Sequence, residues 1–291
     1  MICLLITIAL NILISSLFKF FPKYGINTLQ AIVVNYAVCV ATGCVYMGAV
    51  PDLAVVSHTS WFPWSALVGV MFMSIFSLLA YCTIVDGITT AVIANKLSLA
   101  IPVVFAIIVF REHIGIIKVA GILLAFPAIY FTAKAPGENG KPQNLFWPAL
   151  LFLGGGALDT VMNFIQHNFL DTPNDQALYS LFCFFFAAIV GASVVVFQII
   201  RGKLKFEIKN VVAGICLGIP NYFSIYFYVR TLHSNFLQSS ATIPVLNIGI
   251  LIASALVALI AFRERFGWTR IAGLAISVIA ILMIAFGDKS W

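Results

Sequence analysis

Ten long apolar stretches constrain the fold more than any other feature of this sequence. A helix needs about 20 apolar residues to cross a hydrocarbon core of roughly 30 Å. Backbone groups must be hydrogen-bonded inside lipid, and the runs do not alternate as barrel strands do, so we expect helices. The stretches cover residues 2–18, 29–49, 62–85, 88–110, 115–133, 145–167, 176–200, 210–230, 235–262 and 267–287. The predicted fold is all-α, a polytopic membrane protein with ten transmembrane helices.

Composition agrees with this prediction and excludes a water-soluble domain. Hydrophobic residues make up 62% of the 291-residue chain and charged residues only 9%, whereas soluble proteins carry roughly 25% charge. The net charge of +6 comes from basic residues scattered over short loops, so no basic face for nucleic acid is expected. The first stretch has no basic leader and no small-residue cleavage site, so it is predicted to be a retained span. The lipid bilayer is the expected environment.

An internal repeat relates the two halves of the chain. A constant shift of 152 residues sets 107–121 (IIVFREHIGIIKVAG) against 259–273 (LIAFRERFGWTRIAG), and seven of the fifteen positions are identical. The third and eighth stretches fit this shift only with a gap, whose place the sequence does not show. We assign residues 1–135 to a first five-helix repeat and residues 145–288 to a second.

Five spans per repeat is an odd number, so the second half is predicted to be inverted in the membrane relative to the first. Inverted repeats are typical of secondary transporters, which bind their solute near the midplane where the two halves meet. The sequence therefore favours a transporter.

The architecture resembles the drug/metabolite transporter superfamily, in particular its EamA-type members. The resemblance covers the whole chain and is concentrated in residues 105–125 and 257–277, where Phe-Arg-Glu precedes a short turn and a glycine-bearing span. Glu264-Arg265 keeps the Glu-Arg pair of the family's turn motif, whereas Glu112-His113 does not. The resemblance implies transport of amino acids, other metabolites, sugar conjugates or drugs, and it does not fix the substrate.

Two charged residues lie clearly inside predicted spans, Lys96 and Asp159. A charge at bilayer depth costs at least ~2.5–3.5 kcal/mol on insertion scales, which makes both residues functional candidates. Lys96 is a candidate partner for a substrate carboxylate or phosphate, and Asp159 is a candidate for proton coupling. The structural alternative is that the two side chains pair or snorkel and only hold the bundle together.

The shift of 152 residues also superposes Asn11 on Asn163 and Asn95 on Asn247. These amides either line a pseudo-symmetric cavity, as donors and acceptors, or hydrogen-bond between helices. Asn163 follows Asp159 by one turn, on the same helix face.

The eighth stretch contains a proline in its interior, followed by polar and aromatic residues. Pro220 frees a backbone carbonyl, and Asn221 and Tyr222 come directly after it. Pro102 and Pro244 mark either further hinges or packing kinks. We include Asn221 and Tyr222 among the candidate solute contacts.

Small-residue patterns have a structural explanation. Gly214-xxx-Gly218, Ala187-xxx-Gly191 and the triplet at 154–156 are expected to allow close helix approach. The charged turn residues at 111–112 and 263–264 are expected to pair locally and fix each hairpin. A gate latch is the alternative role.

No cofactor, metal or catalytic site is predicted. The six cysteines lie in apolar runs without a CxxC pair, the four histidines are dispersed, and there is no HExxH or GxSxG motif. We expect no enzyme activity and no ATP-driven transport by this chain alone. A channel is disfavoured, because no filter-like motif or charged ring is present.

Orientation stays open. With the N-terminus inside, the cytoplasmic loops would hold four Lys or Arg residues and the opposite side eleven. The positive-inside rule then places both termini outside, whereas the resembling family usually has them inside.

The prediction is therefore a gradient-driven secondary transporter of a small organic solute in a bacterial inner membrane, with protons as a possible coupling ion. A multidrug exporter for cationic compounds is the alternative. The predicted solute contacts are Lys96, Asn95, Asp159, Asn163, Asn247, Asn221, Tyr222 and Asn11. Oligomeric state is not predicted.

Overall fold

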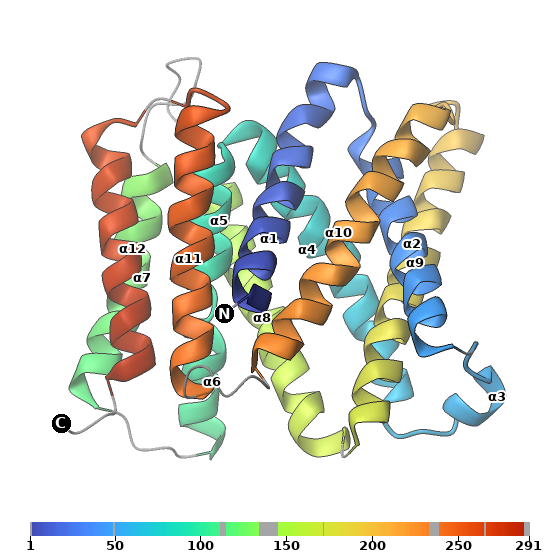
Figure 1. Cartoon of the computed structure of the whole chain (residues 1–291), viewed down its shortest axis with the longest axis horizontal. Coiled ribbons are helices and arrows are strands. Elements are labelled where there is room, and N and C mark those ends of the chain that lie inside the picture. Colours follow the sequence, from blue (N-terminus) through green and yellow to red (C-terminus); the bar gives the residue numbers. More distant parts are fainter. Residues whose placement is uncertain are drawn as a thin grey trace. The chain divides into compact units, whose positions relative to one another are not determined.

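The protein is helical throughout the part of the chain that its computed structural model describes, with no strand in that part (Figure 1). The described residues are 2–48, 50–110, 115–133, 145–170, 172–232, 239–264 and 266–287. Their helices are α1 (Ile2–Phe20), η1 (Phe21–Tyr24), α2 (Thr28–Met47), α3 (Leu53–Val56), α4 (Phe62–Val85), α5 (Ile88–Leu97), α6 (Ala100–Phe110), α7 (Ile116–Ala133), α8 (Phe146–Phe169), α9 (Pro173–Ile200), α10 (Ile208–Leu232), α11 (Ser239–Ile260) and α12 (Trp268–Phe286).

Nine of the ten predicted stretches each overlap one helix within the described residues. Among the described residues, eight spans are long and apolar enough to cross a bilayer, and two shorter apolar helices, at 116–132 and 245–260, accompany them. The stretch at 88–110 forms two helices, α5 and α6, rather than the single helix expected from its hydropathy. The chain is therefore an all-helical integral membrane protein.

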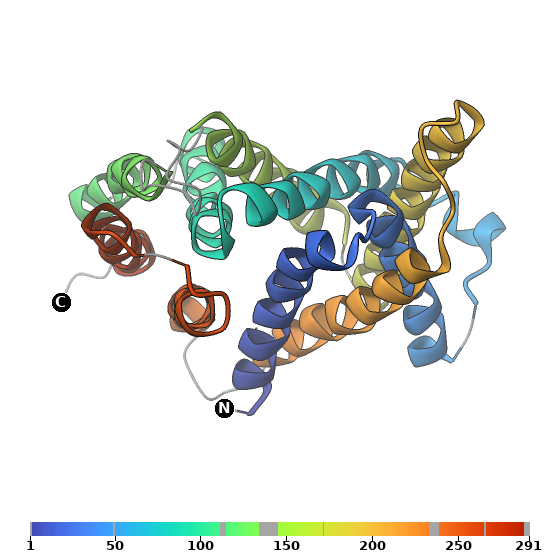
Figure 2. The same ribbon diagram turned by 90° about the horizontal axis from the view of Figure 1, so that it is seen from above.

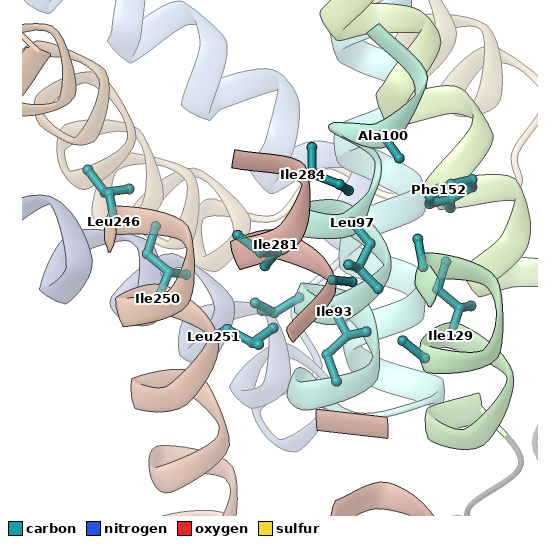
Figure 3. Packing of buried hydrophobic residues seen from close by; sticks show 14 of the residues in the cluster. Ile93, Leu97, Ala100, Ile129, Phe152, Leu246, Ile250, Leu251, Ile281 and Ile284 are labelled. Carbon is teal, nitrogen blue, oxygen red and sulfur yellow. The ribbon is translucent and has the colours of Figure 1, made fainter. Parts of the chain in front are cut away.

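The chain divides into two compact units, and each unit draws segments from both sequence repeats. Unit 1 comprises residues 1–19, 78–157 and 224–291, and unit 2 comprises residues 20–77 and 158–223. The core of unit 1 lies where α5 meets α7, α11 and α12, and Figure 3 shows Ile93 and Leu97 of α5 within it. The core of unit 2 includes Trp61 and Phe182.

Helices that correspond in the two repeats pack against each other. In unit 1, α7 packs on α12 and α5 packs on α11, and in unit 2, α2 packs on α9. Figures 1 and 2 both show α7 and α12 side by side. These pairs join the fifth predicted span with the tenth, the fourth with the ninth, and the second with the seventh.

The contact between α7 and α12 is reciprocal. A Cβ added at Gly121 would lie 2.9 Å from the backbone N of Ile284, and one added at Gly273 would lie 2.9 Å from the backbone N of Thr132. The shift of 152 residues relates Gly121 to Gly273 and also Thr132 to Ile284. Because the early part of one helix meets the late part of the other in both contacts, the two helices are antiparallel.

Two glycine contacts in unit 2 are related by a shift of 145 residues rather than 152. A Cβ at Gly69 of α4 would lie 2.6 Å from Phe186 Cβ of α9, and one at Gly214 of α10 would lie 2.4 Å from Val34 Cβ of α2. The shift of 152 relates Val34 to Phe186, so Gly69 and Gly214 occupy equivalent positions although they are only 145 residues apart.

The seven missing residues lie in a connection between helices. The segment 48–61 joins α2 to α4 and includes the short helix α3, whereas α9 and α10 are joined by 201–207, which is seven residues shorter. The shift is 152 again at Asn95 and Asn247.

Close approach through small residues, as predicted from the sequence, is confirmed at Gly214, Gly218 and Gly191. A Cβ at Gly218 would lie 2.7 Å from Val38 Cβ, and one at Gly191 would lie 2.6 Å from Val33 Cγ2. Any larger residue at these positions would push α10 or α9 away from α2.

Candidate functional site

The interruption between α5 and α6 lies inside one apolar span. In a continuous helix the carbonyl of Ser98 would accept a hydrogen bond from residue 102, but Pro102 has no N–H. The Ser98 carbonyl instead accepts from the N–H of Ile101 at 3.0 Å, and the Ser98 hydroxyl donates to the Asn95 carbonyl at 2.6 Å. Of the two roles considered for Pro102, hinge or packing kink, the structure shows a helix break.

Lys96 and Asn95 lie at the interruption, in the last turn of α5. Both side chains are half-buried, whereas the rest of α5 is buried. A cation in the last turn complements the partial negative charge at the carboxyl end of a helix. Interrupted helices that end within the membrane are also where secondary transporters bind solutes and ions.

The glycine triplet of α8 lets this helix approach the interruption closely. A Cβ at Gly155 would lie 3.2 Å from Ser98 Oγ, and one at Gly156 would lie 2.4 Å from Ile101 Cδ1. The predicted structural role of the triplet is confirmed for these two glycines, and their partners are the residues that form the break.

The other end of α5 is held by a buried carboxylate. Glu264, in the connection between α11 and α12, is 2% exposed. Its Oε1 accepts a hydrogen bond from the backbone N of Ile88 at 3.0 Å, which satisfies one of the amide groups that a helix leaves open at its start. Gly87 is required here, because it has a φ of 94° and an added Cβ would lie 2.8 Å from Glu264 Oε2.

Two cations pair with this carboxylate. Lys19 Nζ lies 3.6 Å from Glu264 Oε1, and Arg270 Nη1 lies 3.3 Å from Glu264 Oε2. Arg270 also reaches the Asp86 carbonyl, with its Nη2 at 3.5 Å. Residues from α1, α12 and the connection before α5 therefore meet in one buried group, which we call the Glu264 cluster: Lys19, Asp86, Glu264 and Arg270.

Asp86 is the second acid of the Glu264 cluster and is 1% exposed. Burial raises the pKa of its carboxyl from 3.8 to about 6, against the lowering effect of Arg270 and Lys19. This carboxyl therefore changes charge in a mildly acidic range, within reach of physiological pH.

The predicted local pairing in the turn at 263–264 is confirmed for Glu264, which pairs with Arg270 six residues later. The turn depends on Arg263, whose φ of 52° is in the left-handed region, and on the Glu264 N–H, which donates to the Ala258 carbonyl at 2.9 Å. The corresponding residues Arg111 and Glu112 lie outside the described residues. Nothing in the sequence predicts that Glu264 also binds α5 and Lys19.

In unit 2, Asn221 belongs to a buried polar group between α10 and α2. Its Nδ2 donates to Asn35 Oδ1 at 3.1 Å and lies 3.7 Å from Cys39 Sγ. Asn35 is fully buried, and its Nδ2 has no hydrogen-bond partner within the part of the chain that the structure describes. Tyr222 packs against α2, with its ring centroid 6.5 Å from that of Tyr46.

The remaining candidates are divided between the units. Asp159 and Asn163 lie on the part of α8 that belongs to unit 2, and both side chains are exposed. Asn11 and Asn247 lie in unit 1 and are half-buried. Asn11 donates to the Thr7 carbonyl at 2.9 Å within α1.

Asn35 and Asp86 were not selected from the sequence. Asn35 is an amide in the interior of an apolar span, and that polarity alone is a usable signal. Asp86 follows directly after a span and looked like an ordinary loop residue, so nothing local marked it as buried.

No family model matches the sequence. An uncharacterized protein of Haemophilus influenzae is 24% identical to this chain over 297 residues, covering 98% of each. A protein of solved crystal structure has a similar fold, with a TM-score of 0.57 and 16% identity over 98% of this chain and 97% of that one. Both likenesses extend over almost the entire chain.

Proposed function

We propose that this protein is a secondary transporter of a small organic solute, an amino acid or another metabolite, and that it works by alternating access. The observation that carries the proposal is the packing of corresponding helices from the two repeats against each other. A pseudo-twofold relation of this kind, between repeats with an odd number of spans, is the architecture on which many secondary transporters are built.

The argument for inversion rests on the direction of the helices. The two contacts between α7 and α12 require an antiparallel pair. If each repeat contributes five spans, corresponding helices are expected to cross the membrane in opposite directions, and the antiparallel packing of α7 and α12 supports this. The equivalence of Gly69 and Gly214 accounts for the gap that the third and eighth stretches require.

The interruption at Lys96 supports the assignment of a solute contact. A helix that ends inside an apolar span brings backbone groups and a cation together at bilayer depth, where lipid offers no partners. Lys96 favours a solute with a carboxylate or phosphate group, and Asn95 adds an amide donor and acceptor. We propose Lys96 and Asn95 as solute-binding residues, with Asp159, Asn163, Asn247, Asn221, Tyr222 and Asn11 as further candidates.

We further propose membership of the drug/metabolite transporter superfamily, among its EamA-type ten-helix proteins, and a location in a bacterial inner membrane. The support is the span pattern, the Glu-containing turn that precedes the last helix, and the repeat. An ion gradient, of protons in the first place, is the proposed energy source, and no enzyme activity is proposed.

The test is uptake of labelled solutes into proteoliposomes, with and without a pH gradient. The panel contains neutral and acidic amino acids, a sugar phosphate and a quaternary ammonium dye. We expect saturable uptake of an anionic or zwitterionic solute, and an increase in KM of about tenfold or more in Lys96→Ala, since a hydrogen bond to a charged group is lost. Lys96→Arg is expected to retain part of the affinity.

Lys118→Ala is the matched control, because Lys118 is likewise half-buried but lies in the first turn of α7. Unchanged uptake by folded Lys96→Ala would show that Lys96 is structural. Transport of the dye alone would favour a multidrug exporter, and conductive leak without saturation or counterflow would favour a channel.

A further inference from the structure

The two ends of unit 2 carry charges of opposite sign. Contacts between Gly43 and Leu181 and between Gly191 and Val33 show that α2 and α9 are antiparallel. The ends are roughly 30 Å apart, since α2 has 20 residues. The first end, which we call the basic end of unit 2, carries Lys23, Arg201, Lys203, Lys205 and Lys209 against the single acid Glu207.

The opposite end of unit 2 is acidic. The described residues at this end, 50–61 and 172–175, contain Asp52 and Asp175 and neither lysine nor arginine. Asp52 is exposed and caps α3 through the Ala54 N–H at 2.9 Å. Unit 2 therefore has a basic end and an acidic end at opposite ends of α2 and α9.

A buried amide network holds the two connections of the basic end together. Asn210 Oδ1 accepts from the Asn27 N–H at 2.8 Å, and Asn210 Nδ2 donates to Gln30 Oε1 at 2.7 Å. Gln30 Nε2 donates to the Lys205 carbonyl at 2.7 Å. Asn210 and Gln30 are both buried, so the backbone between α9 and α10 is fixed on the start of α2.

The basic side chains of this end are exposed, whereas the amide network holds the backbone between α9 and α10. Lys23, Arg201, Lys203 and Lys205 are exposed. Glu207 pairs with Lys209 at 2.9 Å. The aromatic rings of Tyr24 and Phe206 lie beside them and are 64% and 65% exposed. Exposed aromatic rings next to cations at a span end are typical of the headgroup layer of a bilayer.

We propose that the basic end of unit 2 binds the headgroups of acidic phospholipids, and that this end faces the cytoplasm. Clustered lysine and arginine beside a span is attracted to the anionic cytoplasmic leaflet, and this attraction is confined to about a Debye length. The acidic end then faces outward, in agreement with the positive-inside rule. This assignment follows the charge count rather than the usual orientation of the resembling family.

The lipid part is tested with purified protein in neutral detergent, titrated with phosphatidylglycerol or phosphatidylcholine. Because a ligand that binds the folded state raises the unfolding temperature, we expect phosphatidylglycerol to raise it by roughly 4 °C more than phosphatidylcholine does. The triple variant Lys203→Gln, Lys205→Gln, Lys209→Gln is expected to lose at least half of this difference. The corresponding triple arginine variant keeps it.

Asp52→Asn, at the acidic end, is the matched control and is expected to respond as the wild type does. If the triple glutamine variant does not fold, Arg201→Gln with Lys203→Gln replaces it. Equal responses of the wild-type protein to both lipids would overturn the proposal, as would a full response of the glutamine variants.

The orientation part is tested by labelling single introduced cysteines with a membrane-impermeant maleimide in a bacterial host. Ser60 and Phe206 are both exposed, at the acidic and the basic end respectively. Ser60→Cys is expected to label in intact cells and Phe206→Cys only after permeabilisation, with the wild-type protein as the blank for its native cysteines. The reverse pattern would overturn the orientation. Neither test depends on solute transport.

Discussion

The two units hold their helix ends together with different chemistry. In unit 1 the start of α5 is bound by a charged group, in which Glu264 pairs with Lys19 and Arg270. In unit 2 the start of α2 is bound by neutral amides, Gln30 and Asn210. Both groups are buried, but only the charged one contains a side chain, Asp86, that titrates in a mildly acidic range.

This difference places a titrating group, Asp86, directly before the start of α5. Neutral amide networks keep the same hydrogen bonds over a wide pH range, because none of their members titrates. A buried ionic group changes its net charge with pH and becomes strongly destabilising when one partner is lost. The helix attached in this second way is α5, which carries Lys96 at its other end.

The largest effect is expected from Glu264→Ala. The substitution removes the acceptor of the Ile88 N–H and leaves the buried Arg270 and the half-buried Lys19 without this carboxylate. Loss of one partner from a buried ion pair predicts a decrease of about 4 kcal/mol in the free energy of unfolding. Chemical unfolding in detergent, followed by circular dichroism, measures it.

Glu264→Gln is the control, because it keeps an oxygen for Ile88 and removes only the charge. We expect a smaller loss for Gln than for Ala. If Glu264→Ala unfolds within about 1 kcal/mol of the wild type, within the range of an exposed ion pair, the charged group does not hold α5 and the contrast between the units fails.

The second effect is a dependence of the free energy of unfolding on pH, which is caused by Asp86. The raised pKa of about 6 means that the folded protein binds this proton more tightly than the unfolded chain, whose value is near 3.8. The stabilising contribution of the protonated carboxyl is complete below pH 3.8 and is lost as the pH rises through about 6. Relative to the wild type, Asp86→Asn should gain stability over this interval, by up to about 3 kcal/mol.

Unfolding of both proteins from pH 4 to pH 8 measures this difference. Asp52→Asn, which replaces an exposed acid of unit 2, should show no comparable change with pH relative to the wild type. A difference between Asp86→Asn and the wild type that does not vary with pH would show that Asp86 does not titrate in this range.

Much of the helical architecture could be predicted from the sequence, because crossing a bilayer imposes length and apolar composition on each span. The interruption of the fourth predicted span, between α5 and α6, could not be predicted in this way. Pro102 stands at a helix break, whereas α10 continues through Pro220 and α7 through Pro127. Local sequence shows the missing N–H in each case, but whether the helix continues depends on what packs around it.

The candidate site was predictable in part. Lys96 and Asn95 were identified because they are polar residues in an apolar run, and the structure places them at the interruption. The partners of Glu264 were not, since Ile88 is 176 residues away along the chain and no local pattern encodes such a contact. The resemblance between repeats located the turn at Glu264 but said nothing of which helix it binds.

The smallest of the three effects on stability is expected from the amide network of unit 2. Asn210→Ala removes the acceptor of the Asn27 N–H and the donor to Gln30, so we expect a loss of about 2 kcal/mol in the free energy of unfolding. Because the network contains no titrating group, the loss should be the same at pH 5 and at pH 8.

Asn210→Asp is the control, since it keeps the acceptor for Asn27 but places a carboxylate beside Gln30 and should make the loss depend on pH. A pH-dependent loss in Asn210→Ala itself would show that the amides of unit 2 are coupled to a titrating group. The helix ends of both units would then be held by groups whose strength depends on pH, and the contrast between the units would fail.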